Sequence, residues 1–587
     1  MTHPSNKLSQ FWQELKRRKV LRVITVYAAV AFVILQLVEI LAPSLRLPEW
    51  TMNFILVLLI VGFIITVIVS WIYDIHPEGG IVKTEPTHIV KEEDKSSTSN
   101  SWKIASYISF VVIVALILFN IIGKSKESVD ISDSRKTIAV LPFENMSDKS
   151  EFAHIGDAIT DEIIMQLYKI NAFEVRSRTS IMQYKSSDMG SPAIGQELNA
   201  NYLLEGSAQR HEDQVRIRVQ LIHAASDDHI WGEVYEGEWQ DILDIQINVA
   251  KQVASELKTI LSPLEIESIE SKSTENIEAY NLYLRGRYFY NLKGKENMDQ
   301  SIELFKRALE IDPDFALAYS GMAASYNYYG QVGISPRKDI MEQAKTAAME
   351  ALIIDNTLGE AHAELAWTRV YQDFDWIRGE KGFIRAIELN PNYVSAHAKY
   401  AWLLTIVGRH DEAIEEINRA IELDPLSQGL RGALGRMYLY AREYDKALEV
   451  FREINEDPPG MDYVNFQIAL VLSAKGLHAE AAEVCSRVDR HNGDIGYIYG
   501  MAGQKEKTQE ILDYFIELSE NEFVSPTHFT FLYLGLGEKE KAIEWLDKAN
   551  EQHEGWLLLE KVDPMYDSLR PDPRFQNLLE QMNYPDN

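Results

Sequence analysis

Two histidines and two aspartates stand close together in the middle of the chain, where they are the first candidates for chemistry. His223 and His229 flank Asp227 and Asp228. Imidazole nitrogens and carboxylate oxygens are common ligands of zinc and related metals. A polar hairpin turn beside a strand explains the same four residues, and we prefer that interpretation. The pattern therefore predicts no metal site.

The single cysteine, Cys485, is the other candidate for reactive chemistry. With one cysteine, an intramolecular disulfide is excluded, as is any metal site that needs two or more cysteines from one chain. Cys485 also takes the place that Ile417 and Phe451 take in other units of a repeat described below. That position favours a packed core thiol over a nucleophile.

The sequence lacks the short motifs that mark several common enzyme classes. It contains no G-x-x-x-x-G-K-[ST], no H-E-x-x-H and no G-x-S-x-G. The run Gly535-Leu536-Gly537 begins like a dinucleotide fingerprint, but a third glycine and a preceding strand are missing. We therefore predict no catalytic residues, no cofactor and no enzymatic activity.

The charge balance bears on the choice of partner. Lys and Arg total 58 against 88 Asp and Glu, which gives a formal net charge of -30. Non-specific binding to nucleic acid depends on cationic side chains that displace counterions from phosphates. The composition therefore argues against a nucleic-acid partner.

Three long apolar runs occupy the first 122 residues, at about 23–42, 52–73 and 104–122. Each is close to the ~20 residues that a helix needs to cross a ~30 Å hydrocarbon layer. Aromatic residues such as Tyr73 lie at the ends of the runs, as interfacial aromatics do. The pattern predicts three transmembrane α-helices, a membrane module at 23–122 that follows a basic cytoplasmic N-terminus at 1–22.

Basic residues around the apolar runs predict their orientation. Six Lys and Arg residues precede the first run, the loop to the second run contains only Arg46, and the following loop contains four lysines. Because positively charged loops stay in the cytoplasm, the N-terminus is expected inside the cell. An odd number of crossings then places everything after residue 123 on the outer side.

The segment 134–262 shows the pattern of a small α/β domain. A short apolar run at 138–141 indicates a buried strand, and apolar residues four apart from Ile155 to Leu167 indicate one face of a helix. Alternation from Val215 to Leu221 indicates a strand with one solvated face, which we expect to pair with 202–209.

The same segment resembles a known bacterial domain. The runs TIAVLPFENMSDKSEFAHIGDAITDEI, VRSRTS, NYLLEGSAQR and HIWGEVYEGE look like the TolB/FlgO-type N-terminal domain of envelope proteins and CadC-like regulators. No CadC-like winged helix is present. The resemblance implies a membrane-anchored envelope protein, which we expect in the bacterial inner membrane with its soluble domains in the periplasm and the lipid bilayer as one partner.

The rest of the chain repeats with a fixed period. AIELNP ends at Pro391 and AIELDP ends at Pro425, 34 residues later. A 34-residue period with small residues, a large apolar residue and proline at fixed offsets is the tetratricopeptide (TPR) pattern. It predicts an all-α superhelical solenoid of seven or eight helix pairs over 276–552, followed by a capping segment at 553–587.

The repeat register also predicts a binding surface. In this repeat family the first helix of each pair lines the concave face. Counting from the repeat prolines places these residues there: Tyr290, Glu364, Thr368, Tyr371, Trp402 and Arg436. Exposed Trp, Tyr and Arg side chains dominate interface energies because they bury large areas and offer polar groups. Packing of Trp402 against the next helix pair is the alternative.

Two classes of function follow. We favour a membrane-anchored scaffold or sensor that binds partner protein segments through its solenoid. The alternative is a nucleotide-responsive signalling protein, because proteins that resemble this one are sometimes labelled nucleotide cyclases. The partner's identity, the pathway and the oligomeric state do not follow from the sequence.

Overall fold

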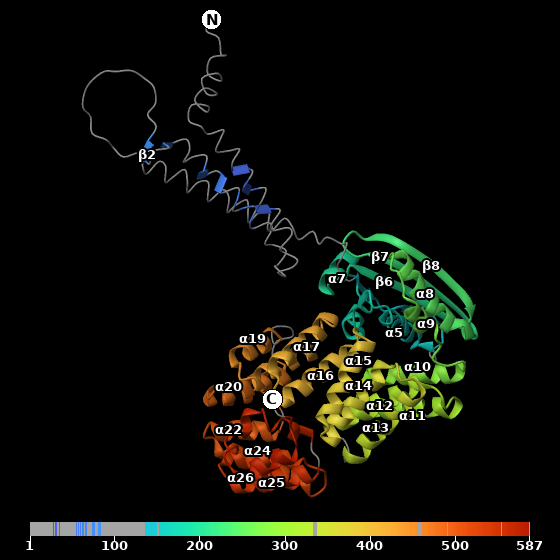
Figure 1. The fold of residues 1–587 in the computed structure, drawn as a ribbon. Helices are drawn as coiled ribbons and strands as arrows, with labels where there is room; N and C mark the ends of the chain where they lie inside the picture. The colour runs from blue at the N-terminus through green and yellow to red at the C-terminus, as the bar shows by residue number, and fades with distance from the viewer. Residues whose placement is uncertain are drawn as a thin grey trace, which may run out of the picture. The chain divides into compact units, whose positions relative to one another are not determined.

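The structure is a computed structural model, and its described residues form two compact units, Met1–Ser128 and Val129–Asn587 (Figure 1). In the first unit, the structure describes scattered positions between residues 27 and 66 and the two short segments 73–76 and 80–83. There, β1 (Tyr73–His76) and β2 (Gly80–Lys83) form an antiparallel pair. The second unit is described over residues 136–149, 152–332, 337–454, 461–489, 491–552 and 555–585.

The prediction of three transmembrane helices is wrong for the described residues. Among them, no helix is both long and apolar enough to span a bilayer. That finding also removes the basis for an integral inner-membrane protein with a bilayer partner. The predicted run 104–122 lies outside the described residues, and the runs 23–42 and 52–73 contain only separate described positions. The described positions of these two runs up to residue 66 are helical, but none belongs to a described helix that is long enough and apolar enough. Tyr73, expected at the end of the second span, belongs to β1.

The second unit begins with a six-stranded sheet in the order β5-β3-β6-β7-β8, with β4 paired to β6. Strand β3 pairs in parallel with both β5 and β6. The pairs β6–β7 and β7–β8 are antiparallel. The predicted pairing of 202–209 with 215–221 is confirmed, with Leu204 opposite Leu221. The strands are β3 (Lys136–Val140), β4 (Glu144–Asn145), β5 (Phe173–Val175), β6 (Tyr202–His211), β7 (Gln214–His223) and β8 (Asp228–Glu238).

Helices cover the apolar side of this sheet. The predicted stripe from Ile155 to Leu167 is buried on α5 (Ile155–Tyr168), and α8 (Ile242–Glu256) packs beside it. Along β7 alternate residues are buried, as expected for a strand with one wet face. Shorter helices complete the domain: α6 (Arg178–Ile181), α7 (Ser191–Glu197) and α9 (Pro263–Glu270).

Sixteen helices in eight antiparallel pairs follow in the described part of the chain (Figure 1). The first helices of the pairs are α10 (Ile277–Leu292), α12 (Ala316–Val332), α14 (Gly359–Asp373), α16 (Val394–Val407), α18 (Gln428–Tyr440), α20 (Asp462–Ala474), α22 (Gly493–Met501) and α24 (Pro526–Leu536). The second helices are α11 (Lys295–Ile311), α13 (Arg337–Ile354), α15 (Trp376–Leu389), α17 (His410–Leu423), α19 (Tyr444–Ile454), α21 (His478–Cys485), α23 (Lys505–Ser519) and α25 (Lys539–Glu551).

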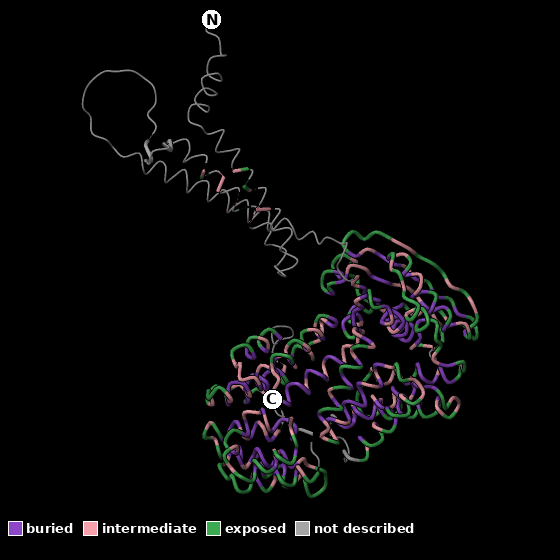
Figure 2. The backbone as a smooth tube through the Cα atoms, viewed as in Figure 1, coloured by how far each residue is buried: buried purple, intermediate pink, exposed green. Residues whose placement is uncertain are grey.

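Small and large residues alternate where the helices of a pair meet. The ring of Phe451 on α19 is fully buried and lies where a Cβ on Gly435 of α18 would be only 2.6 Å from it. The repeat residues Ala413, Ile417 and Ala420 on α17 are likewise fully buried. Buried residues, drawn in purple, recur along the helices of the array in Figure 2. This close packing is the reason for the 34-residue pattern.

The α/β domain is docked onto the repeat array by buried hydrogen bonds. The Asn392 side chain donates to Phe173 O at 3.0 Å and accepts from Val175 N at 3.3 Å. Ser180 Oγ donates to Asp424 Oδ1 at 2.5 Å. Arg176, which is 1% exposed, donates through Nη1 to the carbonyl of Glu422 at 2.8 Å. These bonds connect the end of β5 and α6 with α16, α17 and the loops beside them.

The chain ends in a segment that is not a repeat. It contains two short 3-10 helices, η4 (Gly555–Leu559) and η5 (Pro564–Tyr566), and α26 (Pro573–Gln581). Leu557, Tyr566 and Phe575 are buried in a hydrophobic cluster with residues of α24 and α25. We refer to residues 555–585 as the C-terminal strap.

Candidate binding groove of the repeat array

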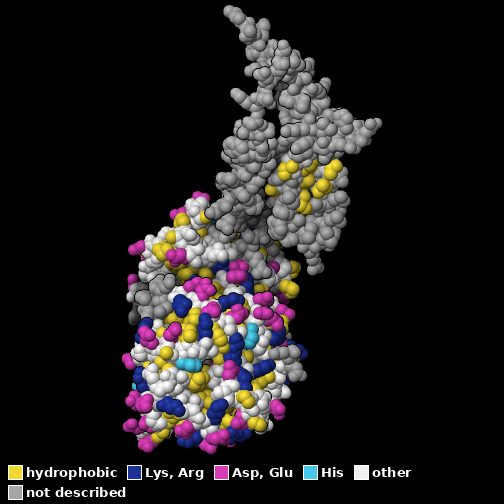
Figure 3. Space-filling model, turned by 90° about the vertical axis from the view of Figure 1, so that its left-hand side faces the viewer, with side chains coloured by type: hydrophobic (Ala, Val, Ile, Leu, Met, Phe, Trp, Pro, Cys, Tyr) yellow, Lys and Arg dark blue, Asp and Glu magenta, His cyan; other side chains and the backbone are white. Residues whose placement is uncertain are grey.

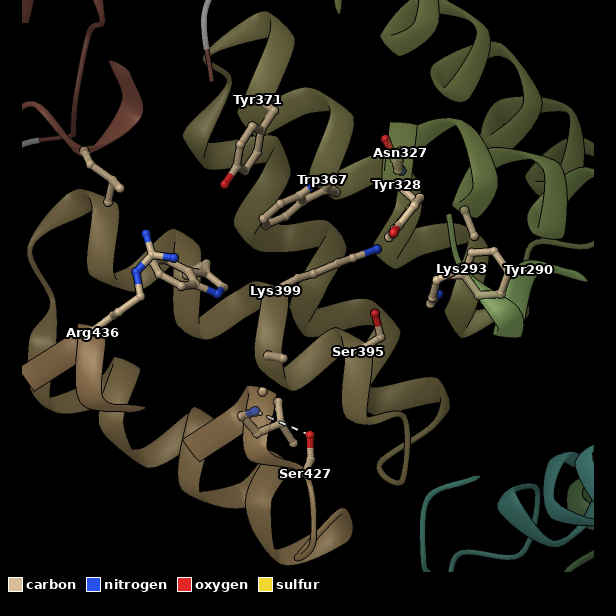
Figure 4. Close-up of a pocket in the computed structure, with 16 residues that line it drawn as sticks. Tyr290, Lys293, Asn327, Tyr328, Trp367, Tyr371, Ser395, Lys399, Ser427 and Arg436 are labelled. Carbon is tan, nitrogen blue, oxygen red and sulfur yellow. Dashed lines mark hydrogen bonds between the residues drawn. The ribbon is translucent and has the colours of Figure 1, made fainter. Parts of the chain in front are cut away.

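The first helices of five successive pairs enclose a cavity of about 630 Å³. This cavity, which we call the groove, is open to one side, and Figure 4 shows its labelled side chains directed into a common space. Its aromatic and cationic lining residues are Tyr290, Tyr328, Trp367, Tyr371, Trp402, Lys293, Lys399 and Arg436.

Helical spacing builds the aromatic wall. Trp367 and Tyr371 are four residues apart on α14 and so lie on the same face of the helix, with their ring centroids 4.0 Å apart. Trp402 on α16 contacts Tyr440 on α18 edge-on, with a centroid separation of 6.4 Å. Trp402 is half-buried, so it both packs against the next helix pair and lines the groove.

Each of the three cations lies over an aromatic ring. Lys293 Nζ is 3.6 Å from the Tyr290 ring centroid, Lys399 Nζ is 5.7 Å from that of Trp367, and Arg436 Cζ is 4.6 Å from that of Trp402. Acidic and basic side chains are interspersed on the face drawn in Figure 3. The groove is therefore a locally basic site in a chain whose net charge is -30.

Lys293 is held in an unusual way. It is the first residue after α10, and its backbone φ of 58° and ψ of -178° form a conformation that residues other than glycine rarely adopt. The next residue, Gly294, also has a positive φ, of 83°. Burial, reinforced by the positive charge of Lys399, lowers the pKa of Lys293 to about 8. The turn thus places an exposed cation at the edge of the groove.

A buried ion pair positions the second lysine. Glu364 on α14 is 1% exposed and accepts from Lys399 Nζ at 2.5 Å and from Asn327 Nδ2 at 2.7 Å. Glu364 therefore links α14 to α16 through Lys399 and to α12 through Asn327. Among the described residues that line the groove itself, the charged ones are Lys293, Lys399 and Arg436, and none is acidic.

Two buried polar atoms in the groove lining have no hydrogen-bond partner among the described residues. They are Asn327 Oδ1, an acceptor, and Trp367 Nε1, a donor. Both residues are only 2% exposed. Buried polar atoms are almost always satisfied, so these two are exceptions in the wall of the groove.

The groove continues into a smaller cavity at each end. A cavity of about 410 Å³ shares Tyr290 and Ser395 with the groove and is lined on its far side by Arg178 and Thr179 of the α/β domain. A cavity of about 260 Å³ shares Arg436 and Leu559 with the groove and is lined by residues of the C-terminal strap. The concave face is thus bounded by two different parts of the chain.

The predicted groove residues fall into two sets. Tyr290, Tyr371, Trp402 and Arg436 line the groove together. Glu364 lines the adjoining 410 Å³ cavity and is buried in its ion pair. Thr368 is fully buried and donates to the carbonyl of Leu365 at 2.9 Å, so it lies outside the groove.

Register counting missed other lining residues. Trp367 lies four residues before Tyr371, and Lys399 lies three before Trp402. These are the spacings of one helix face, so a search for i±3 and i±4 neighbours would have found both. Lys293 follows the end of α10 and had no such signal. Asn327 had no such signal.

The other candidate residues lie elsewhere. His223 and Asp228 are opposite each other at the exposed turn between β7 and β8, with His223 Nδ1 2.8 Å from Ser226 Oγ. No group of three or more potential metal ligands occurs in the described part of the chain. Cys485 is 1% exposed at the end of α21.

Comparison with known proteins identifies both parts of the second unit. Residues 134–252 match the family profile of the HilA/YgeH-like transcriptional regulator, second domain, rather than a TolB/FlgO type. Residues 290–315 and 383–415 match tetratricopeptide repeat profiles.

Two curated relatives extend over more of the chain. The chain is 32% identical over 236 residues to a putative adenylate cyclase 3 of Rhizobium meliloti, covering 40% of each chain. It is 23% identical over 332 residues to the transcriptional regulator HilA of Salmonella typhimurium, covering 54% of this chain and 58% of the relative. The chain thus spans about half the length of the curated relatives it matches.

Solved structures include TTC0263, a TPR protein of Thermus thermophilus. It is 19% identical, the alignment covers 33% of this chain and 98% of that chain, and the TM-score is 0.28. From the family profiles alone, the chain carries a HilA-like second domain followed by tetratricopeptide repeats, an architecture consistent with a protein–protein interaction scaffold.

Proposed function

We propose that this protein is a non-catalytic scaffold whose groove binds an extended segment of a partner protein. The segment carries a carboxylate next to an apolar or aromatic side chain. The observation that carries the proposal is the groove itself, which combines aromatic walls, an excess of cations and a buried unpaired donor and acceptor.

An extended peptide has the hydrogen-bonding groups that the groove lacks. Each peptide unit offers one N–H donor and one C=O acceptor. A backbone N–H of the partner would satisfy Asn327 Oδ1, and a backbone C=O would satisfy Trp367 Nε1. Asn327 is already oriented, because its Nδ2 donates to Glu364 at 2.7 Å. The site therefore offers contacts to backbone atoms of any sequence.

The side-chain preference follows from the charges and the rings. Lys293, Lys399 and Arg436 face the groove with Glu364 as their nearby counter-charge. A partner carboxylate gains charge-assisted hydrogen bonds there. The rings of Trp367, Tyr371 and Trp402 offer apolar area for an adjacent aliphatic or aromatic side chain.

Fluorescence anisotropy with the full chain tests the proposal. The probes are two labelled nine-residue peptides, one rich in Glu with Leu and Tyr, the other with every Glu replaced by Lys. Arg436→Gln should weaken the acidic probe about 10- to 100-fold, since a hydrogen bond to a charged group contributes about 1.5–3 kcal/mol. Arg385→Gln is the matched control, because Arg385 is half-exposed on α15 and outside the groove.

A second pair of probes tests the backbone contacts. N-methylation of single amides in the acidic probe should weaken binding at one position and leave its neighbours unaffected, because a single acceptor, Asn327 Oδ1, awaits a donor. Equal binding of the Lys probe, or equal losses in Arg436→Gln and Arg385→Gln, would show non-specific attraction and contradict the proposal.

A nucleotide-responsive protein is the second candidate function. The relative named putative adenylate cyclase 3 favours it, although the match covers 40% of that protein. Aromatic rings beside Lys and Arg can also hold a base and its phosphates. Calorimetric titration of the full chain with ATP separates the two, because only this candidate predicts saturable heat that Arg436→Gln removes.

A further inference from the structure

The C-terminal strap breaks the rule that each repeat contacts only its neighbours. Trp376 Nε1 at the start of α15 donates to the carbonyl of Met582 at 2.9 Å, across 206 residues. The Trp376 and Tyr584 rings stack with centroids 5.1 Å apart and planes inclined by 18°. A segment from the end of the array thus returns to its middle, as the C label in Figure 1 indicates.

The other long-range contacts of the strap follow one rim of the groove. Lys561 Nζ donates to the carbonyl of Val407, the last residue of α16, at 2.9 Å. Arg442, just after α18, pairs with Asp567 at 2.8 Å. The strap therefore contacts the chain just after α14, at the end of α16 and just after α18, the three helices that supply Trp367, Trp402 and Arg436 to the groove.

The strap also offers the groove the chemistry that its proposed partner would bring. Leu559 is 5% exposed and lines both the groove and the adjoining 260 Å³ cavity. Asp563 lines that second cavity together with Arg436. Burial raises the pKa of Asp563 to about 6, while the positive charges of Arg436, Arg442 and Arg570 oppose the rise. An apolar side chain and a carboxylate are thus already present at the Arg436 end.

We propose that the C-terminal strap is a built-in competitor for the groove, and that a partner segment must displace it from Arg436 to bind fully. This inference rests on the proposed function, because it concerns access to the same groove. An extended segment advances about 3.3 Å per residue, so one that continues past Arg436 into the 260 Å³ cavity meets the strap residues that line it. The strap remains attached through its separate cluster with α24 and α25.

Matched cap variants test the competition. Asp563 and Asp572 each cap a helix start, through Met565 N and Arg574 N respectively, and asparagine caps equally well. Asp563→Asn should tighten binding of the acidic probe about two- to tenfold, because the competing carboxylate is gone. Asp572→Asn removes the same charge from the strap outside the groove and should leave the affinity unchanged. Unchanged or weaker binding by Asp563→Asn would overturn the inference.

Hydrogen exchange provides a readout that does not depend on affinity. Saturating acidic probe should speed amide exchange in residues 557–566, since a displaced strap loses protection. Tyr584→Ala should speed the same amides without any probe. Slower exchange on probe binding, or no change in Tyr584→Ala, would show that the strap is a fixed wall. If no variant binds any probe while Tyr584→Ala still speeds exchange, the proposed function fails and the strap contacts stand.

Discussion

Replacing Lys399 with methionine should destabilise the repeat array by about 3–5 kcal/mol, the cost of leaving a buried charge without its partner. Its partner Glu364 is 1% exposed and would retain only the amide of Asn327 as a side-chain donor. Methionine keeps most of the lysine stem, so lost packing contributes little to the expected change.

The second half of the pair should behave differently. Glu364→Gln keeps one acceptor oxygen in place of two, so either Lys399 Nζ or Asn327 Nδ2 loses its acceptor. The Lys399 side chain, 15% exposed, can turn toward water. We expect a loss of about 1–3 kcal/mol. In the double variant no charge is left unpaired, so its loss should be smaller than the sum by about 1–3 kcal/mol.

Urea unfolding followed by circular dichroism gives the free energies, and amide exchange in α12, α14 and α16 shows where protection is lost. Lys345→Met is the control. Lys345 on α13 pairs with Asp373 on α14 at 2.6 Å, but both side chains are about a quarter to a third exposed. Such a pair is worth about 0–1 kcal/mol. If Lys399→Met costs no more than Lys345→Met, the pair is effectively solvated and does not organise the groove.

Three further outcomes are expected. In urea unfolding, Gly435→Ala should destabilise the protein by about 1–3 kcal/mol, because the new Cβ would lie 2.6 Å from the buried ring of Phe451. Gly429→Ala is the control: the atom nearest to its new Cβ is 3.8 Å away, so this substitution should be neutral or stabilising. Burial raises the pKa of Glu560 to about 8, well above the 4.5 of a free glutamate, so the folded state binds more protons than the unfolded state between these values. The free energy of unfolding should therefore fall from pH 5 to pH 8, and Glu560→Gln should remove most of that slope. Binding of the acidic probe should weaken as the pH rises above 8 and Lys293 loses its charge, and a Lys293→Gln variant should bind weakly without that pH dependence.

The repeats were predictable from the sequence because their signal is local. Each unit needs small residues where two helices cross and a proline after the second helix, so the pattern returns every 34 residues. The same register identified Tyr290, Tyr371, Trp402 and Arg436, which the structure brings to one groove. In the α/β domain, alternation along β7 predicted both its wet face and its pairing with β6.

Two errors have physical causes as well. Glu364 was expected to face a partner, but its burial depends on Lys399, 35 residues away, and on Asn327, 37 residues away. Neither residue lies in its own repeat unit, so counting offsets within a unit could not reveal the pair. The membrane prediction relied on hydropathy, on aromatic residues at the ends of the runs and on flanking positive charges, and no helix of the described residues is long and apolar enough to cross a bilayer.

Sequence patterns therefore predicted the repeat helices and the paired strands β6 and β7, because both depend on neighbours a few residues apart. The boundaries of the groove depend on the fold as a whole. The α/β domain contacts the array across 217–246 residues and the strap returns across 125–206. These contacts arise from the curvature of the solenoid, which sums small rotations from every repeat and leaves no periodic pattern in the residues that finally meet.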